Sequence, residues 1–303
     1  EIEELLADRK IEDLLDLSMM IDAEKLAIVQ IASSIISAAH ITGSPLFPLL
    51  VLLLVKLSIQ HGNTSVSAYA YAMYGVILCN VLKDVDTAVQ FGQLALQVVY
   101  KLDAKAIKSE VLAVLGGLLL HRNSHTKEML PLAQEGYVTG LEVGNLEFAG
   151  NNAINVCNNS FWCSQPLAIL VQETRTYSNG FVQLHHLTSA NRCRIFWQSM
   201  LNLLGLAEHP WILSGEALQE KEFLPLLLSA NDLFALYFFY LYKLMLCFWF
   251  GEIEQAINYA IEVRRYSIAG AGFIGEPAFY FYDSLIALEL LSQPSAEAST
   301  VLE

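Results

Sequence analysis

An internal repeat of about 42 residues runs along most of the chain. At three places a small residue and an asparagine precede an apolar run: Gly62-Asn63, Gly144-Asn145 and Ala230-Asn231. Halving the intervals between them and extending the pattern outward gives a register at residues 22, 63, 103, 145, 189, 231 and 272. Repeats of this size are single supersecondary units that bury their apolar faces by stacking on one another. The chain is therefore expected to be a repeat protein.

Each unit contains two helical stretches separated by a short turn. In the clearest unit an apolar stretch over residues 66–82 is followed by a turn at Asp84 and Asp86, with Asp86 as the expected N-cap, and by an amphipathic stretch over 87–102. No run of the sequence has the alternation and flanking turns of a strand. The sequence predicts an all-α fold, an α-solenoid of about six to seven antiparallel helix pairs. It is tetratricopeptide-like, although the period exceeds the roughly 34 residues of that repeat.

The same register predicts one tetratricopeptide-like domain over residues 1–303. It has a capping helix at 1–21, repeats at 22–291 and a polar tail at 292–303. Hydrophobic residues make up 54% of the chain and charged residues 16%, against about 25% charged in ordinary domains. The first helix of each unit lies between neighbours, so it can be apolar on all sides without a membrane. Exposed apolar surface is expected near Leu5–Leu17 and Phe279–Leu291, at the ends of the stack.

Charge and cysteine content argue against several classes of protein. The chain has 17 Lys+Arg and 31 Asp+Glu, a net charge of −14, which opposes nucleic-acid binding. Leu46–Val55 is too short to cross a bilayer, and Leu233–Phe250 is interrupted by Lys243, so no membrane span is predicted. Five cysteines without a C-x-x-C spacing are expected to be reduced thiols of a cytoplasmic protein.

Several segments carry a family resemblance. They are Ser67-Ala68-Tyr69-Ala70-Tyr71-Ala72-Met73-Tyr74-Gly75, Asp86-Thr87-Ala88, Phe91-Gly92-Gln93-Leu94-Ala95-Leu96, Glu135-Gly136-Tyr137, Gly140-Leu141-Glu142, Leu146-Glu147-Phe148-Ala149-Gly150 and Phe281-Tyr282-Asp283-Ser284-Leu285. Together, from about Glu4 to Leu290, they resemble the helical-repeat region behind the AAA-like ATPase module of cyanobacterial hybrid Ser/Thr kinase–histidine kinases. The resemblance implies a two-component signalling protein whose kinase and ATPase motifs lie outside this segment.

The chemical motifs in the chain do not form a catalytic, cofactor or metal site. No P-loop pattern occurs, and His121-Arg122-Asn123 lacks the aspartate that a kinase base requires. Gly270 to Gly275 matches G-x-G-x-x-G, but a predicted helix rather than a strand precedes it. The paired histidines have no further ligands at metal-site spacing. The segment is therefore predicted not to be an enzyme.

Two polar or small-residue patterns remain as candidate binding features. Gly136 and Gly140 lie four residues apart in one helix, where each glycine costs about 1 kcal/mol relative to alanine. Close packing against the next repeat would compensate, and a ligand or partner helix on this face is the alternative. Asparagine and glutamine form helical stripes in two successive first helices, at Asn151, Asn155 and Asn159 and at Asn191, Gln198 and Asn202. They could line a groove that grips an extended peptide, or satisfy one another between helices.

The leading functional hypothesis is a non-catalytic interaction and regulatory module of a signal-transduction kinase. It would bind a protein or peptide partner, flanking domains of the parent chain included, and couple that binding to the ATPase and kinase domains. The alternative is a helical-repeat domain that senses a small-molecule effector. Neither hypothesis involves a cofactor, a metal or a nucleic acid.

Overall fold

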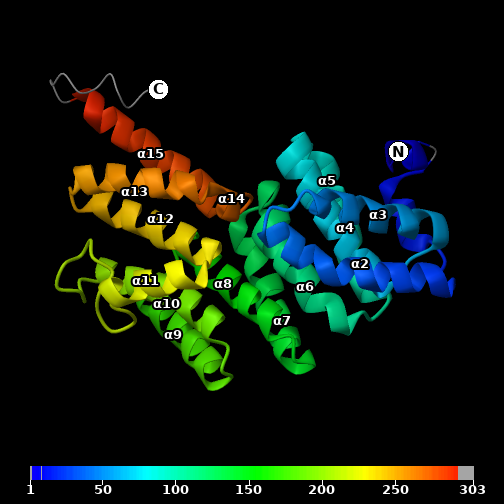
Figure 1. Ribbon diagram of the computed structural model, residues 1–303, viewed down its shortest axis with the longest axis horizontal. Coiled ribbons are helices and arrows are strands. Elements are labelled where there is room, and N and C mark those ends of the chain that lie inside the picture. The colour runs from blue at the N-terminus through cyan, green and yellow to red at the C-terminus, as the bar shows by residue number, and fades with distance from the viewer. Residues whose placement is uncertain (1, 8, 293–303) are drawn as a thin grey trace. The chain divides into compact units, whose positions relative to one another are not determined.

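The computed structural model describes residues 2–7 and 9–292, and this part of the chain contains helices and no strand. The all-α prediction is confirmed. The longer helices are α2 (Ala23–Ile41), α3 (Leu46–His61), α4 (Ser65–Ile77), α5 (Val85–Lys101), α6 (Lys105–Val114), α7 (Leu130–Val143), α8 (Leu146–Trp162), α9 (Leu167–Gln183), α10 (Leu187–Leu203), α11 (Glu220–Ala230), α12 (Leu233–Trp249), α13 (Ile253–Arg265) and α15 (Gly275–Ser292) (Figure 1). Short helices α1 (Ile2–Leu6) and α14 (Ser267–Gly270) complete the set, and π-helical turns extend α4 and α6 through Leu82 and Leu119.

Helices recur along the chain at a nearly constant interval. The first helix of each successive repeat begins at residue 23, 65, 105, 146, 187, 233 or 275. These helices are α2, α4, α6, α8, α10, α12 and α15. A residue with positive φ precedes each of these helices after α2: Gly62, Asp103, Gly144, His185, Asn231 and Gly272. Such a left-handed residue ends a helix and turns the chain. Three of them, Asp103, Asn231 and Gly272, are themselves members of the sequence register.

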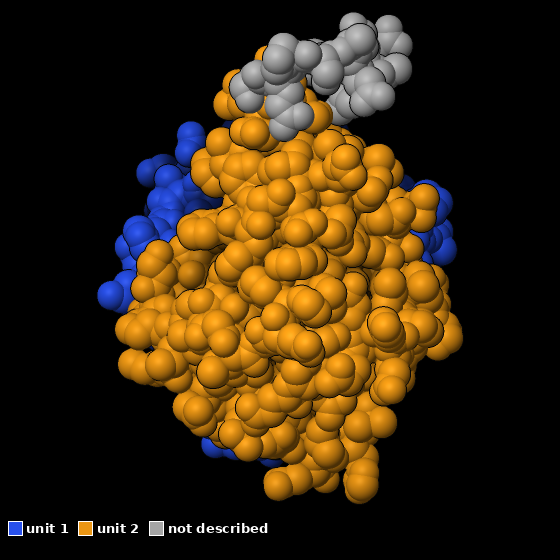
Figure 2. All heavy atoms as spheres, turned by 90° about the vertical axis from the view of Figure 1, so that its left-hand side faces the viewer, with its two compact units in different colours: residues 1–159 blue, residues 160–303 orange. Residues whose placement is uncertain are grey.

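The chain divides into two compact units, residues 1–159 and 160–303 (Figure 2). The single domain expected from the sequence stays a prediction. The polar tail lies outside the described residues except for Ser292, and the segment expected as one capping helix contains α1 and a separate 3-10 helix at Ile11–Asp16.

In the first unit, α4 is the central helix. It contacts α2, α3, α5 and α6, and every residue from Ser67 to Ile77 is buried. Asn63, just before α4, ties the N-terminal segment to this core. Its Nδ2 donates to the Leu14 carbonyl oxygen at 2.7 Å, and its Oδ1 accepts from the Tyr71 hydroxyl at 2.9 Å. The register asparagine therefore holds a turn to the helix that follows it.

In the second unit the central helix is α12. It contacts α10, α11, α13, α14 and α15, and every residue from Ala235 to Cys247 is buried. This surround explains why Leu233–Trp249, apart from Lys243, is apolar on all sides. Among the described residues, one helical stretch, 65–82, is long and apolar enough to cross a membrane, and 72% of it is buried inside the protein.

Exposed apolar side chains occur on most of the helices, so they are not confined to the two expected places. At the C-terminal side, Tyr280, Phe281, Leu288 and Leu291 of α15 are exposed, as expected. At the N-terminal side, Leu14 is fully buried, and the exposed aliphatic residues are Met19 and Ile21, just before α2, and several residues on α2 and α3. The 3-10 segment contacts α5, so its leucines are used internally.

Candidate functional site

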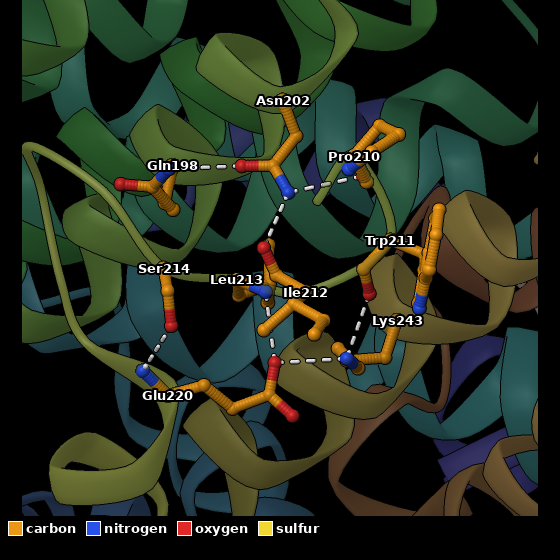
Figure 3. A network of polar contacts seen from close by, with 9 residues as sticks. All are labelled: Gln198, Asn202, Pro210, Trp211, Ile212, Leu213, Ser214, Glu220 and Lys243. Atoms are coloured by element: carbon orange, nitrogen blue, oxygen red, sulfur yellow. Dashed lines mark hydrogen bonds and ion pairs between the residues drawn. The ribbon is translucent and has the colours of Figure 1, made fainter. Parts of the chain in front are cut away.

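The second unit holds a buried polar network built around a long loop, residues 204–219, between α10 and α11 (Figure 3). A loop of this length needs partners for its backbone groups. Two amides of α10 supply them: Asn202 Nδ2 donates to the carbonyl oxygens of Pro210 and Ile212 at 3.0 and 2.6 Å, and Gln198 Oε1 accepts from the Ala217 amide at 3.0 Å. Gln198 Nε2 also donates to Asn202 Oδ1 at 2.8 Å. The loop is thus fixed against α10.

Lys243 of α12 closes the other side of this network. Its side chain is 1% exposed, and Nζ donates to the Trp211 carbonyl oxygen at 2.7 Å and to Glu220 Oε2 at 2.8 Å. The same Glu220 oxygen accepts from the Leu213 amide at 2.8 Å, so it holds the loop as well as the lysine. A buried charge is tolerated only with this kind of pairing. Lys243 and Glu220 therefore clamp the loop between α11 and α12.

A cavity of about 230 Å³, widely open to solvent and with no fully buried residue in its lining, lies in this loop. Its walls combine aliphatic and polar side chains with one carboxylate: Leu206, Ala207, Glu208, His209, Ile212, Ser214, Gly215 and Gln219. Gly215 borders Gln198 so closely that a Cβ atom would lie 2.6 Å from Gln198 Nε2. The Lys243–Glu220 ion pair, which we call the clamp, and the α10 amides thus support the walls of the cavity.

Two residues of the predicted asparagine stripe of α8, Asn155 and Asn159, are buried. Asn155 and Asn159 donate to the carbonyl oxygens of Ala113 and Gly116 at 2.9 and 3.1 Å, while Asn151 is half-buried. These partners belong to the preceding first helix and its π-helical turn. Buried amides satisfied between helices were the alternative to a peptide groove, and this is the arrangement that Asn155 and Asn159 have.

The predicted stripe on α10 is divided in the same way. Gln198 and Asn202 are fully buried and hold the 204–219 loop, whereas Asn191 is half-buried and accepts from Arg194 Nη1 at 3.0 Å. The structure therefore brings two of the six predicted groove residues to the polar network, but as its support rather than as an open surface. Sequence reasoning did not identify Lys243 and Glu220 as partners. A lysine inside an apolar helix was the available signal.

Gly136 and Gly140 lie where helices approach closely. A Cβ atom on Gly136 would collide with the amide of Asn152, and one on Gly140 would lie 2.6 Å from Ser109 Oγ and 2.9 Å from Ala149 Cβ. Asn152 Nδ2 donates to the Ser109 carbonyl oxygen at 2.9 Å. The two glycines therefore make room for a polar contact between α6, α7 and α8.

Glu110 is a second polar feature of the first unit. Burial raises its pKa from 4.5 to about 7, although a hydrogen bond from Asn145 Nδ2 lowers it, and the nearby charge of Glu147 raises it further. Between these values the folded chain binds the proton more tightly than the unfolded chain. The free energy of unfolding should therefore fall as the pH rises from about 4.5 to 7.

Replacing this carboxyl tests that linkage. Glu110→Gln keeps an oxygen that can accept from Asn145 but cannot ionise, so it should be more stable than the parent at pH 8, by at most about 3 kcal/mol, and nearly equal to it at pH 4. Urea unfolding at several pH values measures the difference. Glu142→Gln, at an exposed glutamate, is the control. A Glu110→Gln difference that does not change with pH would contradict the assignment.

No group of three or more His, Cys, Asp or Glu side chains suited to a metal ion occurs in the described part of the chain. The kinase-like His121-Arg122-Asn123 lies at a 3-10 helix, and Gly270 lies against the ring of Tyr237, where a Cβ atom would collide. Both segments therefore have a place in the helical packing that explains their residues.

Comparison with known proteins gives one distant similarity. No family model matches the chain. Over 139 residues, 45% of this chain, it is 24% identical to the hybrid signal transduction histidine kinase G of Dictyostelium discoideum. The chain spans only 4% of the length of that protein. The similarity supports a signalling-protein context.

Proposed function

We propose that the chain is a non-catalytic helical-repeat module of a cytoplasmic signal-transduction kinase, and that it binds a helix of a protein partner. Such a module would couple partner binding to flanking ATPase and kinase domains by repacking stacked helices. The observation that carries the proposal is a pair of exposed aliphatic stripes on the α2–α3 hairpin.

The repeat contacts support the solenoid part of the proposal. In the first unit Asn152, Asn155 and Asn159 bond to residues 43, 42 and 43 positions earlier. In the second unit Arg192 forms a bidentate pair with Asp232, 40 positions later, with both nitrogen–oxygen distances at 2.9 Å. Consecutive first helices are thus held together at the interval of the repeat, as in stacked helix pairs. None of the five cysteines, all of which are described, forms a disulfide bond, which is compatible with a reducing compartment.

The polar clusters favour a structural role over a catalytic one. In the network around Lys243 the charged and amide groups bond to loop backbone or to each other. Catalytic groups are instead left poised toward a substrate. The module would accordingly act by binding.

The α2–α3 surface consists of Ile31, Ile35, Leu46, Leu49 and Leu53, with Ile31 and Leu49 65% and 62% exposed. The spacings of four within α2 and of three and four within α3 place each set on one helix face. Helices α2 and α3 pack against each other, and we propose that their exposed stripes together receive a third helix. The hairpin itself contains only Glu24, Lys25 and Lys56 as charged residues, so the contact should be mainly apolar, while the net charge of −14 of the whole chain favours the approach of a basic helix.

A designed peptide tests the proposal. An amphipathic helix with leucines at positions i, i+3, i+4 and i+7 and lysines elsewhere should bind, and a scrambled peptide of the same composition should bind at least tenfold more weakly. Ile35→Asp and Leu49→Asp should each weaken binding about tenfold or more. Fluorescence anisotropy measures the dissociation constants.

The control is Ile169→Asp, at a residue of α9 that is 62% exposed and outside the α2–α3 surface. It should bind like the parent chain, and all three variants should unfold like the parent because exposed positions tolerate substitution. Equal binding of the ordered and scrambled peptides would contradict the proposal, as would equal loss in all three variants.

A further inference from the structure

We propose that the cavity of the 204–219 loop binds a primary ammonium or guanidinium group carried on a short aliphatic stem. This site lies in the second unit and does not depend on the α2–α3 surface. Its volume of about 230 Å³ equals about eight water molecules at roughly 30 Å³ each. That space suits a ligand of about ten non-hydrogen atoms.

The sign of the charge follows from the walls. Glu208 is exposed and contributes the carboxylate of the lining. The nearby negative charge of Glu220 is paired with the buried Lys243. Glu216 on the same loop pairs with Arg175 at 3.3 Å. The Lys243 ammonium is therefore balanced by Glu220, and the unbalanced charge beside the cavity is that of Glu208. A cationic head group is the complement.

The apolar walls define the stem. Leu206, Ala207 and Ile212 present aliphatic surface beside the polar groups of Glu208, Ser214 and Gln219. A chain of three to five methylene groups would cover that surface while its charged end reaches the carboxylate, as lysine and arginine side chains do on protein surfaces.

Residues 210–214 of the loop are held by hydrogen bonds to side chains of α10 and α12 and to the start of α11. Asn202 fixes the Pro210 and Ile212 carbonyls, Lys243 fixes that of Trp211, and the Glu220 amide donates to Ser214 Oγ at 3.1 Å (Figure 3). A preformed cavity loses less entropy on binding than a mobile loop. The buried clamp therefore has a second role, which is to keep the cavity open.

Agmatine, which carries both head groups on four methylenes, is the probe. Isothermal titration calorimetry near pH 8 should show saturable 1:1 binding that weakens as the salt concentration rises. Glutarate and 1,4-butanediol should not bind. Glu208→Gln should weaken agmatine binding at least tenfold, whereas Glu216→Gln, on the same loop but outside the cavity lining, should change it less than twofold.

Equal agmatine binding by the parent chain and Glu208→Gln would overturn the proposal, as would an absence of saturable binding by the parent. A third titration identifies the source of the cation. A blocked peptide with one internal arginine that binds at least as tightly as agmatine assigns the cavity to a partner side chain. Tenfold weaker binding of that peptide assigns it to a free amine.

Discussion

Lys243→Met should lower the free energy of unfolding by about 3–5 kcal/mol, the cost of removing one member of a buried ion pair. The substitution preserves most of the side-chain volume but removes the charge. It leaves Glu220 without its cation and the Trp211 carbonyl without its donor. Urea unfolding monitored by tryptophan fluorescence and by circular dichroism measures the change.

Two further variants separate the ion pair from general damage to the core. Adding Glu220→Gln to Lys243→Met removes the uncompensated charge, so the double variant should lose less stability than the sum of the two single losses. Lys221→Met, at an exposed neighbouring lysine, should change stability by less than about 0.5 kcal/mol. A loss below about 1 kcal/mol for Lys243→Met, or strictly additive losses, would contradict the clamp.

Gly136→Ala should destabilise the chain by about 1–3 kcal/mol, although an alanine in a helix interior normally stabilises it by about 1 kcal/mol. The reversed sign comes from the Asn152 amide, which occupies the place of the missing Cβ atom. Asn152 cannot move away without losing its hydrogen bonds to the Ser109 and Phe148 carbonyls, at 2.9 and 2.8 Å. Thermal and urea unfolding both report the effect.

Gly116→Ala is the matched control. A Cβ atom at Gly116, also buried, would meet its nearest neighbour, the Met129 carbonyl oxygen, at 3.7 Å, an ordinary contact. This variant should be neutral or more stable than the parent. Combining Gly136→Ala with Asn152→Ala should recover part of the loss, because the second substitution removes the colliding amide. A stabilising Gly136→Ala would show that α7 and α8 are not in close contact there.

The arrangement of the helices could be predicted from the sequence because each repeat contains the same local signals. A residue that accepts a left-handed conformation, such as Asp103 or Asn231, ends one helix before the next apolar stretch begins. These signals are local, so they can be recognised in a single sequence. The close approach at Gly136 and Gly140 was also predictable, since two interior glycines need compensation.

The candidate site depended on contacts that the sequence does not encode locally. Whether Asn155 faces a groove or the helix behind it depends on how far one helix is rotated against the next. Likewise, Lys243 and Glu220 are 23 residues apart on different helices, and only the path of the 204–219 loop brings them together. That loop has neither helical periodicity nor a recognised motif, so its sequence does not predict the cavity.

Hydrogen exchange of the chain with and without the leucine-stripe peptide tests partner binding at the α2–α3 surface most directly. The account predicts slower amide exchange within residues 27–53 at saturating peptide, and unchanged exchange in residues 160–292. The Ile35→Asp variant should show clearly weaker protection at the same peptide concentration. Protection confined to residues 160–292, or no change in residues 27–53 with the peptide bound, would contradict the account.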